Sequence, residues 1–157
     1  GQYADGDLWL HIPRLELTLP VLNGVDPNTL KKGIGLFDQA QLPGALSKNS
    51  NVAIAGHRDI HGYEFYYIDQ MEVGDPIYLR YQGDLFTYEM EEQWITHDRD
   101  WDPIKTRDYS CGTLHTCKPI RVASHRIFTM GRLVEITRES DFPESAAVSA
   151  ESSPPAE

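Results

Sequence analysis

The sequence predicts an all-β fold, either a barrel or a sandwich, on three observations. Short apolar or alternating runs recur along the chain and are separated by turn residues, which is typical of β-strands. Patterns with helical periodicity are few. The chain has 157 residues, the size of one domain that can bury a core without disulfide bonds. Together these features favour a single antiparallel-rich β-domain.

The first part of the chain predicts two strands and one helix. Residues 1–6 are polar, and we expect a flexible N-terminal segment there. Residues 7–22 are rich in leucine and alternate, which predicts two short strands with a bend at Pro13. Residues 26–33 predict a short helix, because a proline lies near its start, lysines lie in its last turn and a glycine follows.

The next stretch predicts mostly irregular structure around one strand. Residues 33–49 contain glycine, Pro43 and many polar residues, so we expect a loop. Residues 51–56 form a short apolar run that ends in glycine, which predicts a strand. Residues 63–70 are compatible with one helical turn.

A hairpin is predicted in the middle of the chain. Gly74, Asp75 and Pro76 predict a turn. Residues 77–81 alternate and predict a strand, and residues 85–95 predict the returning strand. Gln82-Gly83-Asp84 between them supplies the turn.

The last strands are predicted at 113–117 and 126–138, with Gly131 as a candidate bulge. The stretch 96–110 that precedes them is charged and irregular. Residues 139–157 are rich in Ser, Ala, Pro and Glu, which predicts a disordered tail. We therefore expect one domain over residues 7–138.

Charge and hydropathy limit the function classes. The formal net charge is −10, which disfavours binding to a phosphate backbone, so we expect no nucleic-acid partner. Such a charge favours cationic or amine-bearing partners. No run approaches the ~20 apolar residues of a membrane span. Because the chain begins at Gly1, we expect it to be a piece of a longer protein.

The two cysteines, Cys111 and Cys117, are predicted to be one structural and one reactive thiol. In a continuous strand their Cα atoms would lie roughly 20 Å apart, too far for a disulfide. Period two places Cys117 on the face opposite Leu114, whose side chain belongs in the core. The face with Thr113, His115 and Cys117 is thus expected to point outward, which predicts an accessible Cys117. The alternative is a buried, inert cysteine.

A histidine and an arginine could complete an acyl-transfer site with Cys117. His57 follows Gly56 at the end of a predicted strand, and Arg126 opens the last strand. A thiolate can attack a carbonyl, an imidazole can move protons and a guanidinium can hold the oxyanion. The alternatives are an ordinary surface histidine and a solvated arginine at a strand end. Five other histidines compete for the role of base: His11, His61, His97, His115 and His125.

A zinc site is a further alternative for the same residues. His57 and His61 lie four apart, and Cys111, His115 and Cys117 cluster in the sequence. Zinc accepts these ligand types. However, structural zinc sites usually show paired close spacings, such as two Cys-x-x-Cys units, which are absent from this sequence. We therefore expect no metal ion and no cofactor.

Taken together, these motifs resemble those of the sortase family, the cysteine transpeptidases of bacterial cell surfaces. The resemblance covers about residues 12–138. Thr113-Leu114-His115-Thr116-Cys117 resembles the family's Thr-Leu-x-Thr-Cys signature, and Arg126 lies nine residues after the cysteine, as the family's arginine does. Further segments that fit are 12–15, 32–35, 42–44 and the histidine strand 51–58.

The resemblance implies an eight-stranded β-barrel with one or two short helices. It assigns catalytic roles to Cys117, His57 and Arg126, an oxyanion role to the backbone or hydroxyl of Thr116, and groove positions to Ala55 and His115. It further implies cleavage of a Leu-Pro-x-Thr-Gly-like sorting signal after threonine through a thioacyl-enzyme, and transfer to an amine.

The resemblance also implies a place in the cell and leaves the subclass open. The acceptor amine would belong to a cell-wall precursor or a pilin lysine, and the domain would lie on the extracellular face of the cytoplasmic membrane, through an anchor outside this chain. Residues 56–59 and 68–77 resemble classes D and E, whereas residues 124–127 resemble the pilus-building class C. A pilin polymerase that forms isopeptide bonds is therefore an alternative.

Two rival functions use the same residues differently. A non-catalytic β-barrel binding module would keep them without chemistry, and its Cys117 would then react with thiol reagents no faster than Cys111. A hydrolytic cysteine peptidase would release the same acyl group to water, and added amines would not change its products.

Overall fold

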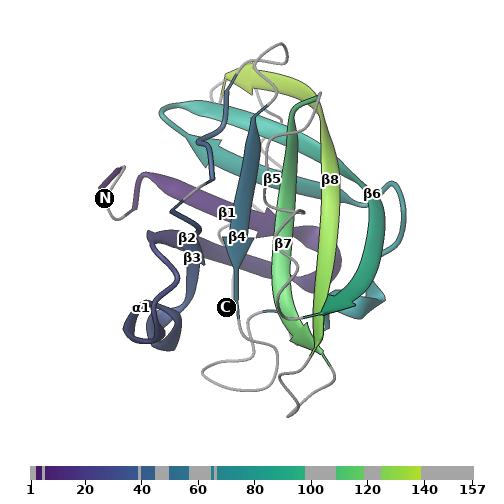
Figure 1. Ribbon diagram of the computed structural model, residues 1–157. Helices are drawn as coiled ribbons and strands as arrows, with labels where there is room; N and C mark the ends of the chain where they lie inside the picture. Colours follow the sequence, from purple (N-terminus) through teal and green to yellow (C-terminus); the bar gives the residue numbers. More distant parts are fainter. Residues whose placement is uncertain are drawn as a thin grey trace.

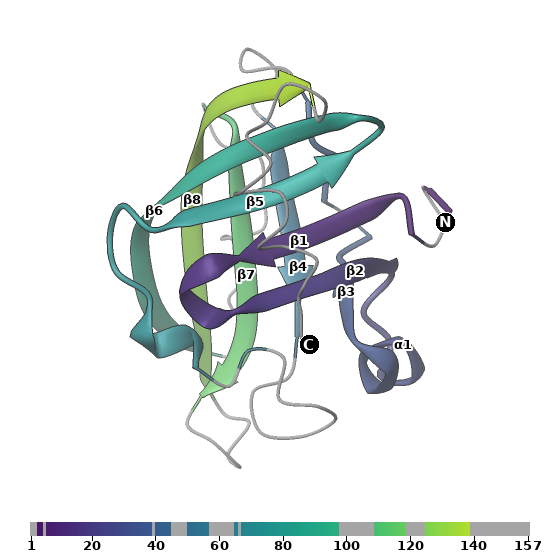
Figure 2. The same cartoon turned by 180° about the vertical axis from the view of Figure 1, so that it is seen from behind.

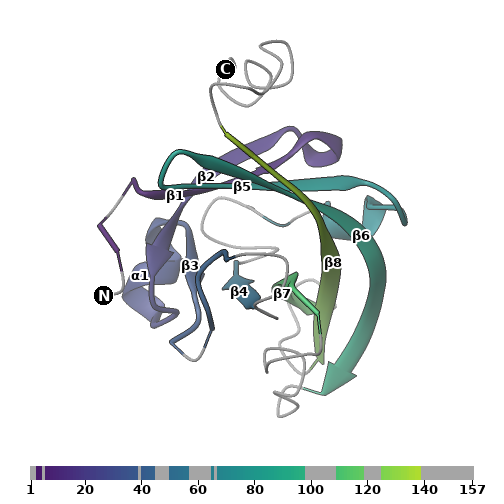
Figure 3. The same cartoon turned by 90° about the horizontal axis from the view of Figure 1, so that it is seen from above.

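The computed structural model is a closed β-barrel, which confirms the predicted all-β class and the eight strands. The structure describes residues 3–4, 6–38, 40–44, 50–56, 65, 67–97, 109–118 and 125–138. Around the barrel the strands follow the order β1-β2-β3-β4-β7-β8-β6-β5. Figure 3 looks along the barrel and shows the strands enclosing a common core.

The strands have the following bounds: β1 Leu8–Ile12, β2 Leu17–Asn23, β3 Ile34–Leu36, β4 Asn51–Ala55, β5 Pro76–Tyr81, β6 Asp84–His97, β7 Cys111–Lys118 and β8 His125–Arg138. The helices are short: η1 Pro13–Leu15, α1 Pro27–Lys32 and η3 Ile68–Gln70. No helix in the described ranges is both long and apolar enough to cross a membrane.

The two N-terminal strands and the helix form where the sequence predicts them. β1 and β2 pair antiparallel on either side of the 3₁₀ turn η1, which begins at Pro13 (Figure 2). Alternation sends Leu8, Leu10 and Ile12 into the core, where none of them is exposed to solvent. α1 begins at Pro27, as the helix signals indicate, because a proline lacks the N–H that a helix start leaves unsatisfied.

Strand β3 lies inside the stretch that the sequence predicts as loop. Its three buried residues pair parallel with β2 and antiparallel with β4. Gly35, at its centre, is packed so closely that a Cβ there would collide with the carbonyl oxygen of Gly24. A strand this short, with a glycine in the middle, carries no alternation that sequence reasoning could detect.

The predicted hairpin is present and its second strand is longer than expected. β5 and β6 pair antiparallel through a tight turn at Gln82 and Gly83, both of which have positive φ. β6 continues to His97, and its partner along this length is β8. The register shifts at two points, where Glu91 of β6 and Val134 of β8 are the extra residues, so irregularities flank Gly131 but the glycine itself is paired with Met90.

The N-terminal segment touches the barrel at Tyr3, within the stretch expected to be flexible. Its hydroxyl lies 2.8 Å from the carbonyl oxygens of Val21 and Leu22, and its ring packs edge-on against Tyr81. Asn23 donates a hydrogen bond to the Tyr3 carbonyl. Residues 139–157, the predicted tail, lie outside the described residues.

Strands β4, β7 and β8 form the wall that carries the candidate site. Figure 1 shows them side by side, with β7 between the other two. β4 pairs parallel with β7, and β7 pairs antiparallel with β8. This arrangement brings the end of β4 and the start of β8 to the same end of β7.

The close approach at Gly35 predicts a large loss of stability on substitution. Gly35→Ala should lower the free energy of unfolding by roughly 2 kcal/mol or more, because overpacking against backbone cannot be relieved by a side-chain rotation. Gly33→Ala is the matched control, since a Cβ there meets nothing within 4 Å. Urea unfolding of both variants checks this, and equal stabilities would contradict the packing of β3.

Candidate active site

The register of β7 and β8 places Cys117 directly opposite Arg126. Residues that face each other in an antiparallel pair have Cα atoms about 4.5–5.5 Å apart and belong to the same face of the sheet. The thiol-bearing residue and the cationic residue predicted from sequence are therefore cross-strand neighbours. Arg126 is half-buried; the side chain of Cys117 is outside the described part of the chain.

The end of β4 lies beside β7 just before Cys117. Ala55 is the register partner of His115, and the next residue, Gly56, donates its N–H to the His115 carbonyl at 3.1 Å. His57 itself lies outside the described residues. The structure thus fixes the residue that precedes the predicted base at a point two positions from the cysteine.

The face that carries His115 is covered, which differs from the expectation of an outward, open face. Leu114 lies in the core as predicted, with 2% of its surface exposed. On the opposite face Thr113 is fully buried and only 8% of His115 is exposed. Thr113 donates a hydrogen bond of 2.8 Å to the amide oxygen of Asn51 in β4. The sheet is therefore covered on both sides at these positions.

Two phenylalanine rings form the surroundings of His115. The imidazole packs edge-on against Phe37 at 5.3 Å between ring centroids and lies 4.9 Å from Phe128. Burial, and to a smaller extent the positive charge of Arg126, lower the pKa of His115 to about 3. His115 is therefore neutral at physiological pH and cannot be the group that protonates near neutrality.

The other predicted site residues, Thr116 and Ala55, lie on opposite faces of the sheet near the ends of β7 and β4. Thr116 lies two residues after Leu114 and therefore shares its face of β7, which points toward the barrel interior. Its hydroxyl oxygen is buried and has no hydrogen-bond partner in the described ranges. This leaves the backbone of Thr116, rather than its hydroxyl, as the group near Cys117. Ala55 ends β4 and is 3% exposed.

Sequence reasoning missed the aromatic residues around His115. Phe128 lies two residues after Arg126 in β8, so period two alone would have placed it on the same face. Phe37 has no such signal, because it follows β3 and reaches His115 only through tertiary packing.

Cys111 occupies the other end of the same strand. It is fully buried, as the structural reading of this thiol predicts. Because β7 is continuous from Cys111 to Lys118, the two cysteines lie roughly 20 Å apart and cannot form a disulfide with each other.

The described residues contain no group of three or more His, Cys, Asp or Glu side chains placed to hold a metal ion. His57 and His61, two members of the zinc alternative, lie outside the described ranges.

The structure is thus an eight-stranded closed barrel in which a cysteine and an arginine are paired between β7 and β8. Residues 10–134 match the family model described as the Sortase domain. The chain belongs to the sortase family.

Relatives of known structure and sequence agree with this assignment. The chain is 32% identical to Sortase SrtE1 of Streptomyces coelicolor over 93% of its own length and 45% of the relative's. The crystal structure of Sortase C-3 from Streptococcus pneumoniae matches 94% of this chain and 71% of that one, with a TM-score of 0.82 and 29% identity. The crystal structure of Sortase E1 from Streptomyces coelicolor, with a tripeptide in the active site, matches 90% of this chain and 96% of that one, with a TM-score of 0.79 and 29% identity.

The chain spans about half the length of the curated relatives it matches. The match with solved structures extends over sortases of several classes, so the fold does not separate the subclasses.

The depressed pKa of His115 predicts how stability depends on pH. The folded protein keeps His115 neutral down to about pH 3, whereas the unfolded chain binds this proton near pH 6.5. The free energy of unfolding should therefore fall as pH drops below 6.5, by at most ~1.4 kcal/mol per pH unit from this group.

Urea unfolding at pH 7.5 and pH 5 tests this, with His115→Gln as the comparison. The variant should lose part of the pH dependence, whatever its absolute stability. Nuclear magnetic resonance of the wild-type imidazole should show no protonation of His115 between these pH values, and a titration midpoint near 6.5 would contradict the burial described above.

Proposed function

We propose that this domain is a cysteine transpeptidase that cleaves a sorting-signal peptide and transfers its acyl part to an amine. The observation that carries the proposal is the cross-strand pairing of Cys117 with Arg126, next to the end of β4 from which His57 follows. These are the residue types that acyl transfer through a thioester requires.

In the first half of the proposed reaction, the Cys117 thiolate attacks the backbone carbonyl carbon of the threonine in the signal. The carbonyl oxygen becomes an oxyanion, which the Arg126 guanidinium and the backbone near Thr116 stabilise. The tetrahedral intermediate collapses, the Thr–Gly amide bond breaks, and the leaving nitrogen takes a proton from the His57 imidazolium. A thioester between Cys117 and the threonine remains.

In the second half, an acceptor amine attacks the thioester carbon and forms a new amide bond. The amine gives a proton to neutral His57, and the C–S bond breaks to return the Cys117 thiolate. Atoms and charges are then restored to the starting state. Water can replace the amine, which would give hydrolysis as a side reaction.

The charge distribution around Cys117 supports its activation. The guanidinium of Arg126 lies on the same face, and its charge is already felt at His115, where it lowers the pKa. A positive charge so placed favours the thiolate over the thiol. His115 is neutral and buried, which argues against a role in proton transfer. By membership of the family, we assign it and Ala55 to the substrate groove.

For the substrate we propose a Leu-Pro-x-Thr-Gly-like signal, by membership of the family. A tripeptide occupies the active site of Sortase E1, which is similar over nearly its whole solved chain, and this supports a peptide ligand here. We propose further that the domain works at the outer face of the bacterial membrane and anchors surface proteins to the cell wall.

A pilin polymerase is the second candidate, and one observation favours it. Residues 124–127, Ser-His-Arg-Ile, resemble the corresponding segment of the pilus-building class C. The two candidates differ only in the amine, which is a cell-wall precursor in the first and a pilin lysine in the second. Competing ligation of one signal peptide to both amines, read by mass, would separate them.

The proposed function is tested by comparing the two cysteines. A library of signal pentapeptides is incubated with amines, and ligated products are identified by mass. Cys117→Ala should abolish cleavage and ligation, since no other thiol lies near Arg126 in the register. Cys111→Ala should retain activity, because this cysteine lies at the far end of β7.

An active Cys117→Ala together with an inactive Cys111→Ala would overturn the assignment. Wild-type protein that cleaves no peptide, and whose Cys117 is alkylated at the same rate in His57→Ala, would favour the binding module. Products that never include the amine would favour a hydrolase.

Arg126→Lys should be far slower than wild type although the charge is kept. A planar guanidinium can donate to two oxygens at once, whereas an ammonium is a compact point charge. Loss of an oxyanion donor costs roughly 10²–10³ in kcat in acyl-transfer enzymes. Steady-state kinetics on the best peptide checks this, and unchanged kcat would remove Arg126 from the mechanism.

A further inference from the structure

We infer that Gln93 is a positioning residue for the reaction, because its amide ties the chain that follows His57 to the strand that carries Arg126. The inference rests on the proposed function. The observations behind it are a pair of hydrogen bonds from one side chain and a close contact at Gly56, all among described residues.

The chain that contains His57 is held where it starts and where it ends. Gly56, at its start, is bonded through its N–H to the His115 carbonyl. Phe65 is fully buried, and its ring lies so close to Gly56 that a Cβ there would come within 2.8 Å of two ring carbons. Gly56 and Phe65, the described residues on either side of this stretch, are therefore in contact.

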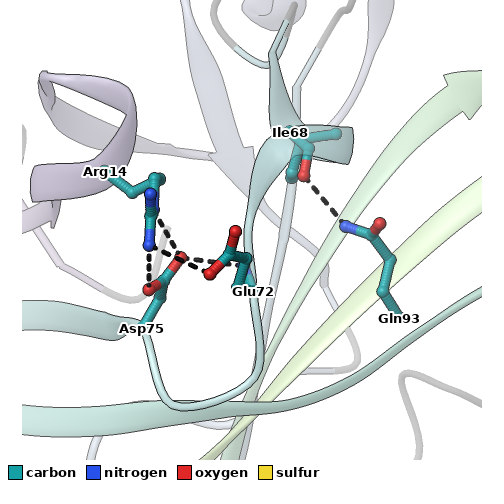
Figure 4. Close-up of polar contacts among 5 residues, drawn as sticks. All are labelled: Arg14, Ile68, Glu72, Asp75 and Gln93. Atoms are coloured by element: carbon teal, nitrogen blue, oxygen red, sulfur yellow. Dashed lines mark hydrogen bonds and ion pairs between the residues drawn. The ribbon is translucent and has the colours of Figure 1, made fainter.

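From Phe65 the chain enters the 3₁₀ turn η3, which Gln93 holds. Ile68 donates its N–H to the Phe65 carbonyl at 3.1 Å. The Ile68 carbonyl in turn accepts a hydrogen bond of 3.0 Å from Nε2 of Gln93 in β6, as Figure 4 shows. An amide nitrogen carries two N–H groups, and this one also donates to the hydroxyl of Thr129 at 2.7 Å.

Thr129 connects this link to the candidate site. It is fully buried in β8, opposite Gln93 in the register and three residues from Arg126. One side chain thus spans β6, β8 and η3, and fixes the return of the His57 chain relative to Arg126. A misplacement of about 1 Å at a reacting group can cost ~10² in rate, so such a link matters for proton transfer.

A second polar link holds the same chain farther from the site. Arg14, in η1, forms two hydrogen bonds with Asp75, at 2.9 and 3.0 Å, and reaches Glu72 at 3.4 Å (Figure 4). Glu72 and Asp75 follow η3 and lie before β5. Arg14 therefore supplies a control, because breaking its ion pair loosens the same connection without touching the Gln93 amide.

The test compares Gln93→Met, Thr129→Val and Arg14→Gln with the wild-type domain. Gln93→Met keeps the side-chain length and removes both donors, so kcat for ligation should fall ~10–100-fold while KM changes by less than about threefold. Thr129→Val removes one of the two bonds with little change in shape and should fall between wild type and Gln93→Met. Arg14→Gln should lower Tm and leave kcat within about twofold.

A readout without substrate separates positioning from folding. The rate of Cys117 alkylation by iodoacetamide is measured against pH, because it reports the thiolate and its imidazolium partner. The profile of Gln93→Met should shift toward that of His57→Ala, and the profile of Arg14→Gln should match wild type.

The positioning role of Gln93 and the proposed function can fail separately in these experiments. Wild-type kinetics and alkylation profile in Gln93→Met, with Cys117→Ala inactive, would overturn the inference and leave the proposed function intact. If the alkylation profile of Arg14→Gln shifted as much as that of Gln93→Met, the inference would also be overturned, because the effect would then not be specific to the Gln93 amide. If Gln93→Met does not fold, a wild-type profile in Thr129→Val overturns the inference. Activity in Cys117→Ala would instead remove the proposed function itself.

Discussion

The pairing register of β7 with β8 is the constraint on which the candidate site depends. A slip by one residue would place Arg126 opposite Thr116 or Lys118, on the other face from Cys117. Packing inside the barrel contributes to this register. Gly131, which faces Gly112 across the two strands, is closely packed: a Cβ there would lie 3.2 Å from the Cβ of the buried Tyr88. A Cβ at Gly112 would make an ordinary contact of 3.7 Å with the ring, so the packing on Tyr88 favours a residue without a side chain mainly at Gly131, five residues from Arg126.

The same pairing determines the electrostatics of the covered face. Phe37 and Phe128 exclude water from His115, so the charge of Arg126 acts through a medium of low polarity and contributes to the depressed pKa of the imidazole. A neutral His115 keeps a second positive charge away from Arg126. In the proposed mechanism this leaves one guanidinium to stabilise both a thiolate and an oxyanion, while protons move only through His57.

Much of this architecture follows from patterns in the sequence, and the remainder depends on tertiary contacts. Alternation placed Leu114 in the core, and turn residues located the β5–β6 hairpin. The cross-strand pairing of Cys117 with Arg126 depends on the register of β7 and β8, which no local pattern encodes. β3 could not be predicted because the three residues around Gly35 show no periodicity. The covering of the face with Thr113 and His115 could not be predicted because Phe37 belongs to a segment distant in the sequence. The positions of Gln93 and Thr129 were equally hidden, since a glutamine in an alternating strand reads as a solvent-facing residue.

The two halves of the proposed catalytic machinery are thus held by interactions of different strength. Cys117 and Arg126 belong to a continuous ladder of eight register pairs between β7 and β8, so the backbone of each is positioned by a strand. Among the described residues on either side of His57, Gly56 is held by a backbone hydrogen bond and by the ring of Phe65, and Ile68 is held by the amide of Gln93. Each of these contacts is worth only a small part of the folding free energy. A substitution in the second group can therefore disturb the geometry of proton transfer while the barrel stays folded. Such variants would stay folded and yet turn over more slowly, which distinguishes the anchoring contacts from core positions such as Gly35, where loss of activity would follow loss of the fold.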